Sequence, residues 1–237
     1  MIVLSIDTCD SRGSVAVLRE DSVLGLIPHD TAEEYSSWLL PAGIAALKRA
    51  GLSMRDVSGY VVAAGPGSFT GVRVGLTTVK AWAEVYGKPV AAVSRLEAIA
   101  SQATGGGGYV AAFVDAQRGQ VFGGVYRKHG AGPAIVGEEM VIAPGNFVEA
   151  ASKLAEGEKI AWVSPDAALL ANEPVWKARE NCGESIGVAS ATLAGIAGRI
   201  GARRLQEGKT TDALGLDANY VRRSDAEIFW KGAAHGR

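Results

Sequence analysis

The chain has 237 residues, 48% of them hydrophobic and 21% charged, which is enough for one large or two small domains with a substantial core. Its net charge of −1 argues against a strongly nucleic-acid-binding surface, and two distant cysteines, Cys9 and Cys182, argue against a disulfide framework or a cysteine metal cluster. Without an apolar run of about 18 residues or a signal-like N-terminus, the sequence predicts a cytoplasmic protein without membrane contact.

The chain opens with three short apolar segments that predict a β-meander. They cover residues 2–6, 14–18 and 22–27. Turn-forming residues separate the first two segments, so these should form a hairpin.

A helix is predicted to follow the meander. Thr31 can cap it with Glu34 at the capping-box position, and Gly51 should end it. Pro41 lies inside this stretch, so we expect it to kink the helix or to move its start later.

Residues 60–93 predict a β–loop–α–β unit, around which the rest of the chain is organised. An apolar strand is followed by the Gly65-Pro66-Gly67 break, and Ser68 can then cap a helix. Apolar residues at helical spacing fill residues 69–86, and residues 90–93 predict a second strand. Such crossovers usually join parallel strands.

The glycine loop has two interpretations. Glycines at a helix N-terminus can bind a phosphate through backbone N–H groups. The Walker pattern, however, needs a lysine where Gly71 is followed by Val72-Arg73. Close packing of the helix through Gly71 and Gly75 is favoured, and the phosphate site stays open as the alternative.

A glycine-rich stretch at residues 104–108 follows a helix capped by Ser94 and is the candidate boundary between two lobes. We expect an N-terminal lobe at residues 1–104 and a C-terminal lobe at residues 105–237, whose last helix packs back on the N-terminal lobe. The second lobe should contain strands at 109–114, 120–126, 134–142 and 159–163, a helix after Pro144, an irregular region at 172–187 and a long helix at 188–206.

An internal repeat supports duplication of one lobe. Asp7 aligns with Asp115 and Arg12-Gly13 with Arg118-Gly119, with two residues fewer in the second turn. In a two-lobed nucleotide-binding fold, these two aspartates would face the cleft and hold metal or water. The alternative is that each caps its own turn.

The sequence gives no indication of a metal site built from histidines. His29, His129 and His235 share no motif and do not lie within helical reach of one another, so no metal site is predicted.

Several stretches resemble the bacterial TsaB (YeaZ) family. In order, they are IVLSIDTCDSRGSVAVL, EEYSSWLLPAGIAALKRAG, AAGPGSFTGVRVGLTTVKAWAEVYGKPVAAVSRLEAIA, VDAQRGQVFGGVY and the closing NYVRRSDAE. The likeness is strong over residues 1–126 and weak beyond them, and its GPGSFTGxRxG core is a specific signal. Tyr35 departs from the pattern, because family members commonly carry a histidine there.

The resemblance implies the α/β actin/Hsp70/sugar-kinase-like (ASKHA) fold, with two duplicated βββαβαβ-type lobes and mixed sheets. It also implies a non-catalytic subunit that supports the paralogous transferase TsaD, together with the ATPase TsaE. These proteins form threonylcarbamoyladenosine next to the anticodon of tRNAs reading ANN codons. The catalytic paralogue carries a His-x-x-x-His pair on its first long helix, whereas residues 31–40 here contain no histidine.

The resemblance also implies the site residues. A vestigial nucleotide cleft would involve Asp7, Thr8, Gly65, Gly67, Ser68 and Asp115. A partner interface, used both for a homodimer and for the TsaD-like paralogue, would involve Trp38, Leu39, Val72, Leu76 and Val79. No catalytic residue, metal or intrinsic cofactor is expected; ATP or ADP, Mg²⁺ and tRNA would act at the level of the complex.

A second class of function stays open, an independently active nucleotide-dependent kinase or ATPase of the same fold that uses Asp7 and Asp115. The missing histidine pair and the missing Walker lysine favour the scaffold subunit.

Overall fold

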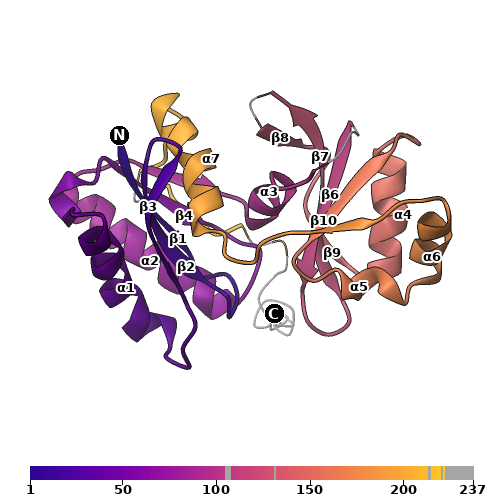
Figure 1. The fold of residues 1–237 in the computed structure, drawn as a ribbon, viewed down its shortest axis with the longest axis horizontal. Coiled ribbons are helices and arrows are strands. Elements are labelled where there is room, and N and C mark those ends of the chain that lie inside the picture. The colour runs from indigo at the N-terminus through magenta and orange to yellow at the C-terminus, as the bar shows by residue number, and fades with distance from the viewer. Residues whose placement is uncertain (105–107, 131, 213–214, 220, 222–237) are drawn as a thin grey trace, which may run out of the picture.

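The computed structural model describes residues 1–104, 108–130, 132–212, 215–219 and 221. The predictions made for residues 105–107, the side chain of His129, most of the closing NYVRRSDAE stretch and His235 lie outside this description. Figure 1 shows two lobes side by side, each built on its own β-sheet, with α3 between them. No helix in the described ranges is long and apolar enough to cross a bilayer.

The N-terminal sheet has the strand order β3-β2-β1-β4-β5. Its strands are β1 (Ile2–Asp7), β2 (Ser14–Arg19), β3 (Ser22–Pro28), β4 (Gly59–Ala63) and β5 (Val90–Val93). The first three form an antiparallel meander, and β4 and β5 add in parallel to β1. The helical elements of this part are α1 (Tyr35–Arg49), η1 (Met54–Asp56), α2 (Phe69–Tyr86) and α3 (Arg95–Ala100).

The C-terminal sheet repeats this arrangement in the order β8-β7-β6-β10-β11, with β9 paired to β7. Its strands are β6 (Tyr109–Asp115), β7 (Val121–His129), β8 (Gly132–Ile135), β9 (Met140–Ile142), β10 (Ile160–Ser164) and β11 (Ile186–Val188). Again an antiparallel hairpin is followed by two parallel strands. The helices are α4 (Pro144–Leu154), α5 (Ala168–Ala171), α6 (Pro174–Asn181) and α7 (Ala194–Gln206).

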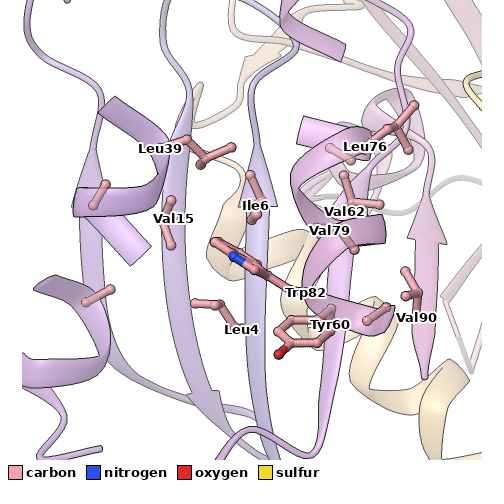
Figure 2. Close-up of a cluster of buried hydrophobic side chains, with 14 of the residues drawn as sticks. Leu4, Ile6, Val15, Leu39, Tyr60, Val62, Leu76, Val79, Trp82 and Val90 are labelled. Atoms are coloured by element: carbon pink, nitrogen blue, oxygen red, sulfur yellow. The ribbon is translucent and has the colours of Figure 1, made fainter. Parts of the chain in front are cut away.

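Side chains along the N-terminal strands point alternately to the two faces of the sheet, and both faces are buried. Leu4 and Ile6 face the layer of α1 and α2, where they pack with Trp82 (Figure 2). Val3 and Val61 belong to a second cluster, which includes residues of α7 on the opposite face. Helix α7, although last in sequence, therefore packs against the N-terminal sheet (Figure 1).

Predictions that rested on local signals are confirmed. The meander, the central β–loop–α–β unit and the caps of α2 and α3 all form: Ser68 accepts a hydrogen bond from the N–H of Gly71, and Ser94 accepts from Leu96 and Glu97. Gly87, with φ of +62°, ends α2 in the left-handed conformation.

Four boundaries differ from the predictions. Helix α1 begins at Tyr35, and the Thr31 hydroxyl accepts from the N–H of Glu33 instead of capping a helix. The predicted strand at 134–142 is divided into β8 and β9 around Gly137, whose φ is +73°. Residues 172–187 contain α6, with Pro174 in its first turn, and the start of β11. The last helix consequently begins at residue 194, not 188.

The repeat is real, but its turns differ less than predicted. Asp7 pairs with Ser14 and Asp115 with Val121, which leaves residues 8–13 (six) and 116–120 (five) as the turns. The second turn is one residue shorter, because Val121, and not Gln120, occupies the position of Ser14.

Candidate functional site

Asp7 and Asp115 end equivalent strands, but their environments differ. Asp7 is fully buried, its Oδ1 accepts a 2.9 Å hydrogen bond from the N–H of Cys9, and its Oδ2 has no partner among the described residues. Burial raises the pKa of Asp7, and the nearby charge of Arg95 opposes that rise only in part.

Asp115 is exposed and is held by Gln117. Its two oxygens accept from the backbone N–H and the side-chain amide of Gln117, at 2.7 and 2.8 Å. Both aspartates therefore cap their own turns, the alternative that the sequence left open.

The glycine loop is packed tightly against the turn that follows β1. A Cβ on Gly67 would lie 2.2 Å from the carbonyl oxygen of Cys9, and one on Gly71 would lie 2.1 Å from that of Thr8. The Thr8 hydroxyl donates to the Gly71 carbonyl at 2.7 Å, and the N–H of Ser68 donates to Cys9 at 2.6 Å. These contacts favour the packing interpretation and not the phosphate site, because the N–H groups of Ser68 and Gly71 donate hydrogen bonds within the protein.

The two glycines of the Gly65-Pro66-Gly67 break have different roles. Gly65 has a positive φ, of +107°. Gly67 is required by the close approach of Cys9 rather than by its own backbone angle.

An ionic cluster that the sequence did not reveal lies where the two lobes meet. Arg95 is buried at the start of α3 and bonds to the carboxylate of Asp10. The same carboxylate accepts from the side chain of Arg12 at 2.8 Å, and Arg12 in turn reaches Asp166 after β10. Burial raises the pKa of Asp10, but Arg95 and Arg12 outweigh it, so that pKa lies below its ordinary value.

Tyr35 stabilises the same loop from α1. Its hydroxyl accepts from the N–H of Gly13 at 2.8 Å and donates to the carbonyl of Asp10. Burial raises the pKa of Tyr35, which keeps the hydroxyl a donor. The departure at this position was the one sequence signal that could have pointed to this contact.

No group of three or more histidine, cysteine, aspartate or glutamate side chains that could hold a metal occurs within the described residues. His29 packs against Tyr35 and Trp38, with ring centroids 4.4 and 4.8 Å apart, and its Nε2 lies 2.8 Å from the Glu33 carbonyl oxygen. The charges at the lobe junction are instead balanced by the protein itself.

The five residues expected at a partner interface lie inside the N-terminal core, so that prediction is wrong for these side chains. They are Trp38, Leu39, Val72, Leu76 and Val79, all at most 7% exposed. Figure 2 shows Leu39, Leu76 and Val79 in the cluster that covers the sheet. Helical periodicity marked the stripe that faces the chain's own strands.

The opposite side of α1 nevertheless carries exposed apolar residues. Leu40 is 52% exposed and Ile44 is 54% exposed, one helical turn apart. On α2, Val85 is 75% exposed. Exposed apolar side chains on a helix are available for a protein–protein contact.

The two mixed sheets and the duplicated lobes define the fold class as actin/Hsp70/sugar-kinase-like. The fold is similar to that of YeaZ from Pseudomonas aeruginosa, with a TM-score of 0.72 and 24% identity, covering 92% of this chain and 99% of that chain. A ROK hexokinase from Thermus thermophilus superposes with a TM-score of 0.52 and 15% identity, covering 86% of this chain and all of that chain.

Within this class, the family is defined by the sequence. The model described as "TsaD: tRNA N6-adenosine threonylcarbamoyltransferase" matches residues 16–212, and the chain belongs to that family. The chain is 36% identical over 143 residues to the tRNA threonylcarbamoyladenosine biosynthesis protein TsaB of Bacillus subtilis, which covers 60% of this chain and 62% of that protein. It is also 38% identical over 118 residues to a tRNA N6-adenosine threonylcarbamoyltransferase of Nitrobacter winogradskyi, covering 41% of this chain and 33% of that protein. The resemblance to TsaB (YeaZ) proteins is thereby confirmed, although the match spans only about three fifths of the TsaB protein's length.

Proposed function

We propose that this chain is a non-catalytic subunit in the formation of threonylcarbamoyladenosine on tRNA. It would support a TsaD-like transferase together with a TsaE-like ATPase, in the cytoplasm, and contact tRNA through the complex. Family membership over residues 16–212 and the likeness to a protein named TsaB support this role.

One observation carries the non-catalytic assignment. The Asp10 carboxylate at the lobe junction is bound by Arg95 and Arg12, and Arg12 is bound in turn by Asp166. A magnesium–nucleotide bound at this carboxylate would have to displace these ion pairs. The sequence of α1 adds support, since residues 31–40 lack the histidine pair of the catalytic paralogue.

The partner surface in this proposal is the exposed side of α1 and α2, around Leu40, Ile44 and Val85. A second copy of the chain and the paralogous transferase would use the same surface and would therefore compete. Nucleotide and Mg²⁺ would be bound by the complex, not by this chain alone.

Reconstitution tests the proposal. The purified chain, a TsaD-like transferase and a TsaE-like ATPase are combined with tRNA and labelled threonylcarbamoyl donor, and each component is omitted in turn. Incorporation should require this chain and should be absent when the chain is tested alone. Incorporation by the chain alone, free of paralogue, or full incorporation without it would contradict the proposal.

An active kinase or ATPase remains the second candidate, favoured by the unpartnered Oδ2 of Asp7. It predicts magnesium-dependent ATP hydrolysis by the isolated chain that is lost in Asp7→Asn. Hydrolysis unchanged in that variant would point to a contaminant.

A further inference from the structure

An ion pair joins the two lobes through side chains, beside the segment where the chain passes from β11 to α7. That segment begins at Val188, which pairs with Ser164, and ends at Ala194, whose N–H donates to the hydroxyl of Ser14. Nη1 and Nη2 of Arg12, in the β1–β2 turn, lie 2.8 and 3.0 Å from the two carboxylate oxygens of Asp166, which follows β10. This is the bidentate geometry that makes a guanidinium–carboxylate pair both strong and directional.

Both ends of the pair are held in place. Arg12 also donates from its backbone N–H and its Nε to Asp10, at 2.8 and 3.1 Å. Asp166 donates its backbone N–H to Ser164, whose hydroxyl donates to the carbonyl of Phe113 in the neighbouring strand. Because both side chains are already held, forming the pair costs little side-chain entropy. The loss of that entropy is the usual reason that surface ion pairs contribute little to stability.

The pair is the outer end of an alternating row of charges. Arg95, with a side chain only 2% exposed, bonds to Asp10, which bonds to Arg12, which bonds to Asp166. The exposed fraction of the side chain rises from 2% at Arg95 to 21% at Asp10 and 39% at Arg12, and Asp166 is 25% exposed. The row thus begins in the interior beside α3 and ends at a contact that water and salt can reach.

The lobes are joined differently around α3. There, Leu96 and Ile99 share one apolar cluster with Val110 and Phe122 of the second sheet. Such a contact tolerates small rotations, whereas a bidentate pair fixes the distance between two loops. The chain itself passes between the lobes near α3 and again just before α7 (Figure 1).

We propose that Arg12 and Asp166 form a latch that keeps the two lobes closed against one another without any bound ligand. The two segments where the chain crosses, at α3 and just before α7, serve as the hinge, and breaking the pair lets the lobes rotate about these segments and separate at the β1–β2 turn. The proposal is independent of the tRNA-modification role, although a fixed lobe angle would suit a scaffold.

The latch is tested by the distance between spin labels on the full chain. One label is attached to the exposed Cys182 and the other to a cysteine introduced by Arg55→Cys, an exposed position in the other lobe. Singly labelled samples account for distances between copies. Arg12→Gln and Asp166→Asn should each shift and broaden the distribution toward longer distances, and the double variant should add nothing further, since both remove one pair.

Two further arms make the outcome decisive. Arg203→Gln is the matched control, because Arg203 is 51% exposed and 3.9 Å from Asp21 within the N-terminal lobe, and it should leave the distribution unchanged. In the unmodified chain, raising the salt from about 0.1 M to about 1 M should reproduce the shift, because the Debye length falls from about 10 to 3 Å. If Arg12→Gln unfolds, Asp166→Asn decides alone, since it leaves Asp10, Arg12 and Arg95 in place. A folded Asp166→Asn variant with the distribution of the unmodified chain would overturn the proposal.

Discussion

The Thr8 hydroxyl donates a 2.7 Å hydrogen bond to the carbonyl of Gly71, so the turn after β1 is bonded directly to the first turn of α2. The bond requires the two backbones to approach so closely that a Cβ at Gly71 would lie 2.1 Å from the Thr8 carbonyl oxygen. Gly75, one turn further, would meet the Thr8 hydroxyl at 2.5 Å. The glycines of this helix therefore serve its docking against β1.

Gly71→Ala should consequently destabilise the fold. The added methyl group meets backbone, which cannot turn aside as a flexible side chain can, so we expect a loss of about 1–3 kcal/mol in the free energy of unfolding. Gly130→Ala is the control, because a Cβ there has no atom within 4 Å, and its effect should stay within about 1 kcal/mol. Urea denaturation of both variants measures the difference. Equal midpoints would mean that α2 can shift away from β1 at little cost.

Two adjacent arginines of α7 should differ in their contribution to stability. Arg204 contacts both oxygens of Glu97 at 2.7 Å and reaches the Ala92 carbonyl, and Glu97 is only 12% exposed. Burial raises the pKa of Glu97 and Arg204 opposes that rise, so Arg204→Ala leaves a buried carboxyl group without its partner. With Arg204 itself 31% exposed, we expect a loss of about 1–3 kcal/mol, discounted for solvent screening.

Arg203→Ala, in the same turn, is the control and should cost less than about 0.5 kcal/mol, because its ion pair with Asp21 is long and exposed. Thermal and urea unfolding of both variants compare them. A larger effect at Arg203 than at Arg204 would show that α7 is held by something other than the pair with Glu97.

The sequence could predict what is encoded locally. The strands of the N-terminal meander, the helix after the glycine loop and the caps Ser68 and Ser94 each depend on residues within a few positions of one another. The pair between Arg12 and Asp166 could not be found in this way, because 154 positions separate its members and each alone looks like a solvated charge.

The interface prediction failed for a related reason. Helical spacing identifies an apolar stripe but does not say what covers it, and on α1 and α2 the chain's own sheet covers it. Leu40 and Ile44, on the opposite side of α1, are also spaced one helical turn apart, and only their exposure distinguishes them from the buried stripe.

Asp7 should make stability depend on pH in the direction opposite to most carboxylates. Because burial raises its pKa, the native state holds more protons than the unfolded state from about pH 4 up to the folded pKa, and stability falls as the pH rises through that window. Asp7→Asn keeps the acceptor for the Cys9 N–H and removes the titration.

The variant should therefore gain relative stability over the parent as the pH rises above about 4. Asp10, whose pKa is lowered, contributes stability that is lost on acidification, but it is present in both proteins and cancels from the difference. Urea unfolding at several pH values measures that difference. A variant that loses stability relative to the parent toward neutral pH would mean that the charged Asp7 is stabilised by Arg95 more than burial costs it.

The proposed partner surface is tested by placing a glutamate on either side of the α1–α2 layer. Val79 has no exposed surface, so Val79→Glu would bury an unpaired carboxylate and should cost several kcal/mol, leaving little folded protein. Ile44 is 54% exposed on α1, so Ile44→Glu should change the stability of the isolated chain by less than about 0.5 kcal/mol. In a complex, however, that carboxylate would enter a desolvated contact between helices.

We therefore expect Ile44→Glu to fold normally, to migrate as a monomer in size-exclusion chromatography and to fail to retain a TsaD-like paralogue in a pull-down. Ile135→Glu is the matched control, because Ile135 is 46% exposed on β8 of the other lobe, and it should leave both associations unchanged. Circular dichroism establishes that each variant is folded before the associations are compared. A folded Ile44→Glu variant that still self-associates and still binds the paralogue would place the partner surface outside α1, because a charge at the centre of a desolvated helix–helix contact cannot be accommodated without loss of affinity.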